Sequence, residues 1–190
     1  MLDKLYNTFL TYGEASMVVL KSLQYNRGKA IHEYGFAIPC IEFAKNITTR
    51  SPKGIIEVGA GTGYLSKYLN NYINTYLNNS VNTYAIPTDV HQGSSGYGFN
   101  IPDTVKQLEG VAAIKRYRKR DILLSWPPYS KSLAYDILTN KSPKQVLYYI
   151  GELDGCTADN KFNSMIHDRI IREVPIPNWP GIYDRLFIIK

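Results

Sequence analysis

Gly54-Ile55-Ile56-Glu57-Val58-Gly59-Ala60-Gly61-Thr62-Gly63-Tyr64 is the stretch that decides the fold of this chain. Its first half is mostly apolar and predicts a buried strand over Gly54–Val58. Three glycines follow at alternate positions, where they permit unusual backbone angles and let a ligand lie against the main chain. After them, apolar and aromatic side chains recur at helical spacing from Tyr64 to Leu77. The stretch therefore predicts a strand, a ligand-binding turn and a helix.

The spacing of the glycines distinguishes between two kinds of nucleotide site. A dinucleotide fold needs Gly-x-Gly-x-x-Gly, and counted from Gly59 its last glycine would fall on Tyr64. Instead, Glu57 precedes the first glycine by two residues, where its carboxylate would face the cationic amino group of a methionine-like ligand. The alternative is a plain glycine-rich turn without a ligand.

This combination of strand, acidic residue, glycine loop and helix resembles the first motif of S-adenosylmethionine-dependent class I methyltransferases. The resemblance implies S-adenosylmethionine as the cofactor. Asp89 ends the second expected strand, where an acidic residue binds ribose hydroxyls in adenosine-binding sheets; its alternative role is to cap a turn. Glu109 follows the third expected strand and would lie near the adenine. The predicted cofactor-binding residues are Glu57, Gly59, Ala60, Gly61, Thr62, Gly63, Asp89, Glu109 and Ser125.

Strands and helices alternate along the chain, which predicts an α/β fold with a mostly parallel sheet flanked by helices. The resemblance makes this fold a Rossmann-like class I methyltransferase domain with an antiparallel terminal strand. Strands are expected at Gly54–Val58, Thr83–Pro87, Thr104–Leu108, Asp121–Ser125, Gln145–Ile150 and Leu186–Ile189. Helices are expected after Pro39 and at Tyr64–Leu77, Val111–Tyr117, Leu133–Leu138 and Phe162–Ile171. Residues 1–33 are expected to form a helical lead-in and residues 34–190 the methyltransferase-like domain.

Ser125-Trp126-Pro127-Pro128-Tyr129 partly resembles the fourth motif of amino-methyltransferases. In that motif an Asp or Asn precedes Pro-Pro-Tyr, and it accepts hydrogen bonds from the target amine together with the carbonyl of the first proline. Here Trp126 takes that place, and an indole donates one hydrogen bond and accepts none. The predicted catalytic residues are Trp126, Pro127, Tyr129 and Glu152.

Three interpretations of this departure stay open. Backbone carbonyls at Trp126 and Pro127 hold an amine alone, or Trp126 and Tyr129 stack on a planar substrate, or catalysis has been lost. Glu152 follows the fifth expected strand, where it would bind a substrate amine, act as a base or cap a helix. Two functions follow. One is an S-adenosylmethionine-dependent methyltransferase whose acceptor stays open between an amine of nucleic acid, a protein and a small molecule, and the other is an inactive binding or scaffold protein on the same fold.

The resemblance to small class I methyltransferase-like proteins extends from Tyr34 to the end of the chain. Within it, Cys156 is expected to be buried and inert, and Thr157-Ala158-Asp159 is expected to cap the helix that follows. Arg185 is expected to pair with a carboxylate.

Composition and charge restrict the partners of the chain. Its 190 residues carry a net charge of +6, partly from a basic run that would contact nucleic-acid phosphates or else form a solvated helix end. That run contains Lys115, Arg116, Arg118, Lys119 and Arg120. No apolar run reaches the roughly 20 residues of a membrane span, and the two Cys and three His lack metal-ligand spacing. An intracellular, cytoplasmic protein without a metal is expected.

Overall fold

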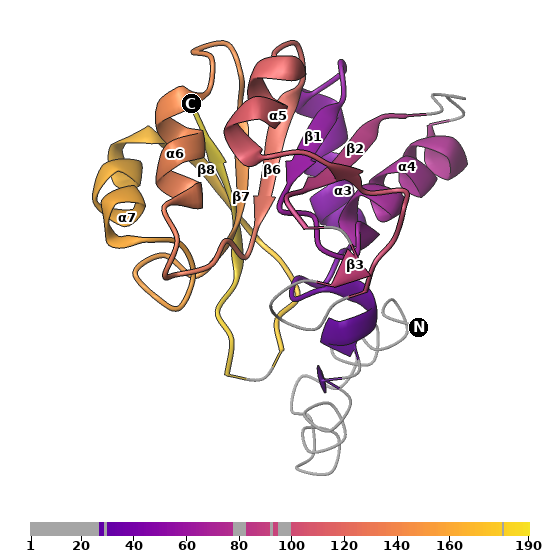
Figure 1. The fold of residues 1–190 in the computed structure, drawn as a ribbon, viewed down its shortest axis with the longest axis horizontal. Helices are drawn as coiled ribbons and strands as arrows, with labels where there is room; N and C mark the ends of the chain where they lie inside the picture. Colours follow the sequence, from indigo (N-terminus) through magenta and orange to yellow (C-terminus); the bar gives the residue numbers. More distant parts are fainter. Residues whose placement is uncertain (1–26, 29, 78–82, 92, 95–99, 180) are drawn as a thin grey trace.

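A sheet covered by helices on both faces forms the body of the protein (Figure 1). The computed structural model describes residues 27–28, 30–77, 83–91, 93–94, 100–179 and 181–190. Most of the predicted lead-in therefore lies outside the described residues.

The strands and helices alternate as the sequence predicts. The main sheet contains β1 (Ile55–Val58), β2 (Ala85–Asp89), β5 (Lys106–Gln107), β6 (Asp121–Ser125), β7 (Leu147–Gly151), β8 (Ile170–Pro175) and β9 (Arg185–Ile189). The helices are α3 (Ile41–Arg50), α4 (Tyr64–Tyr76), α5 (Gly110–Arg116), α6 (Leu133–Asn140), α7 (Asn160–Ile166) and the single turn η1 (His167–Arg169). Residues 30–34 are also helical.

The strand order of the sheet is β5-β2-β1-β6-β7-β9-β8. From β5 to β7 every neighbouring pair is parallel, whereas β9 runs antiparallel to both β7 and β8. The order reverses at β1, which lies between β2 and β6, as in Rossmann-like sheets. The expected mostly parallel sheet with an antiparallel terminal strand is confirmed.

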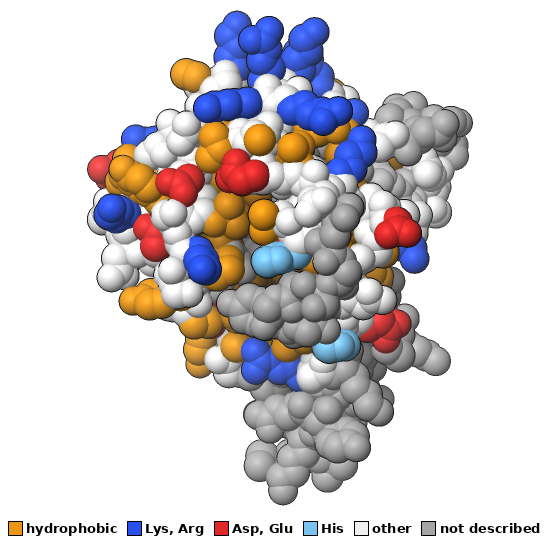
Figure 2. Space-filling view, in the orientation of Figure 1, with side chains coloured by type: hydrophobic (Ala, Val, Ile, Leu, Met, Phe, Trp, Pro, Cys, Tyr) orange, Lys and Arg blue, Asp and Glu red, His pale blue; other side chains and the backbone are white. Residues whose placement is uncertain are grey.

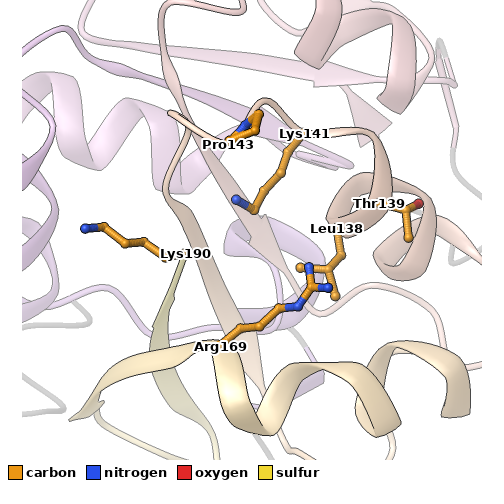
Figure 3. Close-up of a pocket in the computed structure, with 6 residues that line it drawn as sticks. All are labelled: Leu138, Thr139, Lys141, Pro143, Arg169 and Lys190. Carbon is orange, nitrogen blue, oxygen red and sulfur yellow. The ribbon is translucent and has the colours of Figure 1, made fainter.

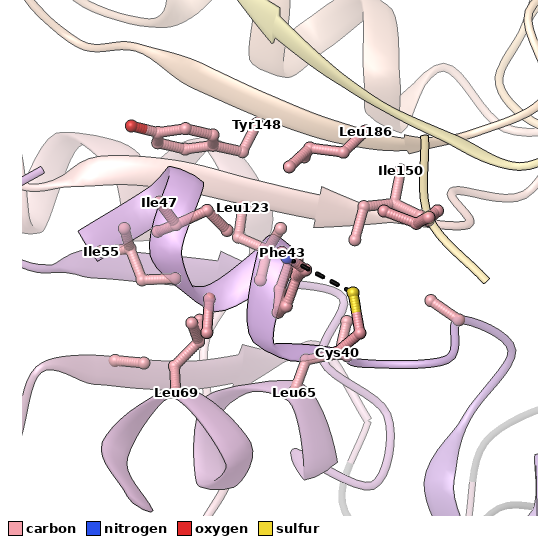
Figure 4. Packing of buried hydrophobic residues seen from close by; sticks show 14 of the residues in the cluster. Cys40, Phe43, Ile47, Ile55, Leu65, Leu69, Leu123, Tyr148, Ile150 and Leu186 are labelled. Atoms are coloured by element: carbon pink, nitrogen blue, oxygen red, sulfur yellow. Dashed lines mark hydrogen bonds between the residues drawn. The ribbon is translucent and has the colours of Figure 1, made fainter. Parts of the chain in front are cut away.

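Two apolar layers fix the helices to the sheet. One contains side chains of α3 and α4, such as Phe43 and Leu69, packed on one face of β1, β6 and β7 (Figure 4). The other contains side chains of α5, α6 and α7, such as Ile114 and Phe162, packed on the opposite face. Because both faces are covered, the strands β1 and β7 are buried throughout and are mostly apolar in sequence, with Glu57 as the charged exception in β1.

The prediction of a helix over Phe162–Ile171 is wrong at its end. The helix α7 stops at Ile166, one 3-10 turn follows, and Ile170 begins the strand β8. This strand was not predicted, because it is an outer strand with a register shift between Ile170 and Arg172 and mostly exposed side chains. Those features remove the regular alternation of apolar and polar residues on which strand prediction depends.

Two smaller differences surround the Gly/Ser-rich segment His91–Asp103. No strand is expected there from the sequence, but β3 (Gly93–Ser94) pairs with β4 (Asn100–Ile101) inside it. The expected strand Thr104–Leu108 shrinks to the two residues of β5. Among the described residues, no helix is both long enough and apolar enough to cross a bilayer.

Candidate functional site

The carboxyl ends of four parallel strands bring the predicted site residues to one edge of the sheet. The register pairs Val58 with both Thr88 and Leu124, and Ser125 with Ile150. The glycine loop after β1, Asp89 at the end of β2, the loop after β6 and Glu152 after β7 therefore share this edge. We call it the carboxyl edge, and it is where ligands bind in open α/β sheets.

The glycine loop has the backbone geometry that the sequence predicts. Gly59, Gly61 and Gly63 have φ of 66°, 52° and 70°, a region that costs other residues roughly 1–2 kcal/mol. Gly63 caps α4 without a side chain, and a Cβ there would lie 2.9 Å from Val105 Cγ2. Ala60 N–H donates to the carbonyl of Thr88 at 2.9 Å, which ties the loop to β2.

Asp89 lies against the glycine loop. Its side chain is 8% exposed, and Oδ2 accepts a hydrogen bond from Gly61 N–H at 3.0 Å. Oδ1 accepts a hydrogen bond from His91 N–H at 3.0 Å. The carboxylate thus caps the turn that follows β2 while it stands beside the loop, so both roles expected of Asp89 are compatible with its position.

Glu57 is buried beneath the loop and bound to α4. Its Oε2 accepts hydrogen bonds from Ser66 N–H at 3.0 Å and from Ser66 Oγ at 2.6 Å. Burial raises the pKa of the Glu57 carboxyl to about 7, although the two bonds from Ser66 lower it. A carboxyl that titrates near neutral pH is unusual and typical of functional sites.

The raised pKa makes a prediction about stability. Because burial raises the pKa of Glu57 from its ordinary value of 4.5 to about 7 in the folded protein, its contribution to stability is present below about pH 4.5 and is lost as the pH rises through 7. Glu57→Gln does not titrate, so between about pH 5 and 8 the free energy of unfolding of the wild type should fall by about 2.5 kcal/mol relative to that of the variant. Denaturant unfolding across that range checks this, and parallel curves for the two proteins would contradict it.

Trp126 is held from two sides at the end of β6. Its ring stacks on Phe36, with centroids 4.8 Å apart and an interplanar angle of 11°. Its indole Nε1–H donates to Asp184 Oδ2 at 2.9 Å. Its φ of 49° turns the chain sharply at this point. One face and the single donor of Trp126 are therefore already engaged, and the half-buried ring also packs against the core beside α3 and α4.

The rest of this loop is fastened to the segment after β7. The carbonyl of Pro127 accepts a hydrogen bond from Ala158 N–H at 2.9 Å, and Pro128 forms a bridge with Thr157. Pro127 itself is buried, so this hydrogen bond holds the loop after β6 against the segment after β7. Tyr129 is 52% exposed, so its ring is accessible at this edge.

Glu152 joins two chain segments at the same edge. Oε1 accepts a hydrogen bond from Tyr183 N–H at 2.7 Å, and Oε2 accepts one from the thiol of Cys156 at 3.1 Å. Partial burial opposes ionisation, but these hydrogen bonds outweigh it and lower the pKa of Glu152. A low pKa suits a structural clamp better than a general base at neutral pH.

The expectation that Cys156 is buried is wrong, because its side chain is exposed. We still predict a slowly reacting thiol, for another reason. Desolvation and the neighbouring Glu152 carboxylate raise the pKa of the thiol to about 11, whereas a free thiol has a pKa of about 8.5.

This pKa predicts slow alkylation of an accessible cysteine. At about pH 8, Cys156 should react with iodoacetamide roughly 100-fold more slowly than a free thiol, because the thiolate is the reacting species. Glu152→Gln removes the neighbouring negative charge and should accelerate the reaction. Mass spectrometry of the modified peptide measures both rates; alkylation of the wild type at the rate of a free thiol would contradict the prediction.

The structure also shows the contacts of three other residues that the sequence analysis singled out. Asp159 caps α7 by accepting from Lys161 N–H and Phe162 N–H, as expected. Arg185 pairs with Glu173 at 3.3 Å, as expected. Glu109 is the exposed N-cap of α5, and its carboxylate accepts hydrogen bonds from Val111 N–H and Ala112 N–H. It lies at the carboxyl edge, but its carboxylate already caps this helix.

Sequence reasoning missed the residues that hold Trp126. Asp184 is 1% exposed, and its Oδ1 has no hydrogen-bond partner among the described residues. Burial raises the pKa of Asp184 to about 7, while the indole of Trp126 and the charge of Arg27 lower it. Asp184 lies 58 residues from Trp126, so no local pattern could have paired them.

Comparisons with known proteins find resemblance only at the level of solved structures. No family model matches the chain, and no curated protein matches it. The chain is similar to the B. subtilis M1A22 tRNA methyltransferase TrmK, with a TM-score of 0.44, 15% identity, and coverage of 77% of this chain and 64% of that one. It is similar to PigF with SAH, with a TM-score of 0.45, 11% identity, and coverage of 97% and 61%.

A third similar structure is a SAM dependent methyltransferase from Aquifex aeolicus. The TM-score is 0.40 at 11% identity, and the match covers 90% of this chain and 98% of that one. This chain spans less than two thirds of TrmK and of PigF. Its own strand order, with one antiparallel strand beside β7, shows the Rossmann-like class I methyltransferase fold.

Proposed function

We propose that this chain is an S-adenosylmethionine-dependent methyltransferase that binds its cofactor along residues 59–63. The observation that carries the proposal is the glycine loop itself, in which all three glycines have positive φ. The loop follows β1, where the strand order reverses, and ligands of such sheets bind at that point. The Asp89 carboxylate beside the loop would accept hydrogen bonds from the ribose hydroxyls of the cofactor.

Glu57 has a defined part in this proposal. A cationic amino group near its carboxylate favours the ionised form and lowers its pKa. Because the free protein holds that pKa at about 7, binding the cofactor requires Glu57 to lose a proton at acidic pH.

The cofactor affinity should therefore depend on pH. At about pH 6 only about a tenth of Glu57 is ionised, so the affinity should be about tenfold weaker than at about pH 8. Glu57→Gln should flatten this dependence, since Gln does not titrate. Calorimetric titrations at the two pH values measure it, and a wild-type affinity that is equal at both would contradict the part given to Glu57.

The acceptor is proposed to be a nitrogen of a nucleic acid or a protein, placed at residues 125–129. When held by residues 59–63, the cofactor would supply an electrophilic methyl group on its sulfonium sulfur. The protein's part is to hold the acceptor in line at about 3 Å from the methyl carbon. The exposed ring of Tyr129 would stack on the acceptor, and backbone carbonyls at Trp126 and Pro127 would accept from its nitrogen.

Calorimetry with S-adenosylmethionine and S-adenosylhomocysteine tests the cofactor site. Both should bind to the folded chain, and NAD should not, because the loop lacks the third glycine of a dinucleotide site. Absence of binding by a folded sample would overturn the proposed enzyme and leave a scaffold or binding protein on the same fold.

Transfer itself is tested with methyl-labelled cofactor and separate RNA and protein fractions. Label should enter one fraction, and Tyr129→Ala should reduce that incorporation while leaving cofactor affinity unchanged. Cofactor binding without label in either fraction would contradict the catalytic half of the proposal.

A further inference from the structure

A basic surface covers the edge of the sheet opposite the glycine loop. The turns that enter β1 and β6 meet at this amino edge, because the register pairs Ile55 with Asp121. The start of β7, the start of β8 and the end of β9 also meet there, since Ile189 pairs with both Leu147 and Ile170. We call the exposed cations of these turns the amino-edge surface: Lys53, Lys115, Arg116, Arg118, Lys119, Lys144, Arg169 and Lys190.

The positive charge of this surface has little compensation. Among the described residues of these turns, the carboxylates are Asp121 and Asp168, and Asp121 already accepts hydrogen bonds from Ser51 Oγ and Val146 N–H. The described part of the chain has two ion pairs, and neither involves a cation of the amino-edge surface. Figure 2 shows the Lys and Arg side chains gathered at the top of the view, at the end of α5.

Part of the surface is hollowed. A cavity of about 420 Å³ is lined by Lys141, Arg169 and Lys190, which come from the end of α6, from η1 and from the residue after β9 (Figure 3). Lys141 donates to the carbonyl of Gln145 at 2.9 Å. Burial and the charge of Arg169 lower the pKa of Lys141, so Lys141 and Arg169 repel each other. An anion placed among them would relieve that repulsion.

We propose that the amino-edge surface binds the phosphate backbone of a nucleic-acid duplex without reading its base sequence. Neighbouring strands lie about 4.8 Å apart, so the five strands from β1 to β8 spread the cations over roughly 19 Å. A duplex presents one charge per about 1.7 Å of its axis, or roughly eleven phosphates over that span. Cations that are spread over separate turns can contact many phosphates of a duplex at once, whereas one small anion would reach only a few of them.

The aromatic side chains favour a duplex over a single strand. Among the described residues of these turns, Tyr117 is the aromatic residue next to the cations, and it is half-buried. Its ring is already covered by Lys106 at 5.6 Å and Arg116 at 5.8 Å. Proteins that bind single strands stack the bases on accessible aromatic rings, and Tyr117 does not offer one. The exposed Tyr76 lies at the end of α4, before β2, and so outside the turns that carry these cations.

The location separates this surface from the proposed cofactor site. The two lie at opposite ends of the same strands, so the inference does not rest on the proposed methyltransferase function. A duplex bound at the amino edge should leave the glycine loop free, and S-adenosylhomocysteine should not compete with it.

Fluorescence anisotropy with a labelled RNA duplex, and with a DNA duplex of the same sequence, tests the proposal. Both should bind, because the phosphate backbone is what they share. If about five cations contact phosphates, raising the salt from about 50 to about 200 mM should weaken binding by roughly 500-fold. Saturating S-adenosylhomocysteine should leave the affinity unchanged.

Two charge-reversal variants test the two ends of the surface, and a third is their matched control. The first changes Lys115, Arg118 and Lys119 to Glu, and the second changes Lys144, Arg169 and Lys190 to Glu. Each should weaken duplex binding by at least about tenfold. The control reverses three exposed cations near the carboxyl edge, Lys67, Lys131 and Lys161, and has the same net charge as the other two. It should change the affinity by less than about threefold.

Several results would overturn the proposal. An equal loss of affinity in the control would mean that net charge alone drives binding. An unchanged affinity in the second variant would mean that only the run at residues 115–119 contacts the duplex. A flat salt response, or binding to phosphatidylserine vesicles without binding to either duplex, would also overturn it. Thermal unfolding of each variant, with a midpoint close to that of the wild type, shows that the comparison is between folded proteins.

Discussion

Gly61→Arg should abolish measurable binding of S-adenosylmethionine, with a loss of at least about 100-fold, or about 2.8 kcal/mol. The Gly61 N–H donates to Asp89, and its φ of 52° belongs to the left-handed region. An Arg side chain there would occupy the space in which the proposed ligand lies against the main chain. It would also place a cation beside the amino group of the cofactor.

A matched control separates this effect from the general effect of an added Arg. Ser164→Arg adds the same side chain at an exposed position of α7, away from the loop. Its cofactor affinity should equal that of the wild type in the same calorimetric titration. If Gly61→Arg is folded and keeps wild-type affinity, the glycine loop is not the cofactor site.

Gly54→Ala should lower the free energy of unfolding by about 3 kcal/mol or more. Gly54 has a φ of 82° at the turn before β1. A Cβ there would collide with the carbonyl oxygen of Tyr84 and with the guanidinium of Arg120. Those two groups are bonded to each other at 2.6 Å, so neither can move away without breaking a hydrogen bond.

Gly35→Ala isolates the backbone part of that loss. Gly35 also has a positive φ, at 90°, but a Cβ there meets no described atom within 4 Å. It should therefore cost only the strain of the left-handed conformation, about 1 kcal/mol. Denaturant unfolding compares the two variants, and equal losses would show that the predicted collision at Gly54 does not occur.

The sequence predicted the central part of the fold well, because local patterns there coincide with the tertiary environment. Asp121–Ser125 was predicted with the bounds that β6 has, and the helix from Tyr64 begins where α4 begins. Burial on both faces made the central strands mostly apolar runs. The conformation of the loop could be predicted because the turn needs positive φ at alternate positions, and glycine is the residue that adopts it most readily.

The outer strands and the packing around Trp126 could not be predicted in this way. The strand β8 pairs on one side only and carries exposed side chains, so its pattern resembles the end of a helix. The Trp126 ring is held by Phe36 and Asp184, which lie far away in sequence on both sides. Such contacts depend on the completed sheet, which places the end of β6 beside the segment that enters β9.

Only part of the basic surface could be predicted from the sequence. Its position at the end of α5, where cations favour the helix dipole, follows from the sequence alone. Its neighbours Lys144, Arg169 and Lys190 join it only through the strand register. A single charged run was therefore visible in the sequence, and the extended amino-edge surface was not.

A crystal structure of the chain grown with S-adenosylhomocysteine tests the central claim most directly. We predict that the ligand lies along residues 59–63, with its ribose hydroxyls within hydrogen-bond distance of the Asp89 carboxylate and its amino group facing Glu57. Ligand density at any other place, with the glycine loop empty, would contradict the account.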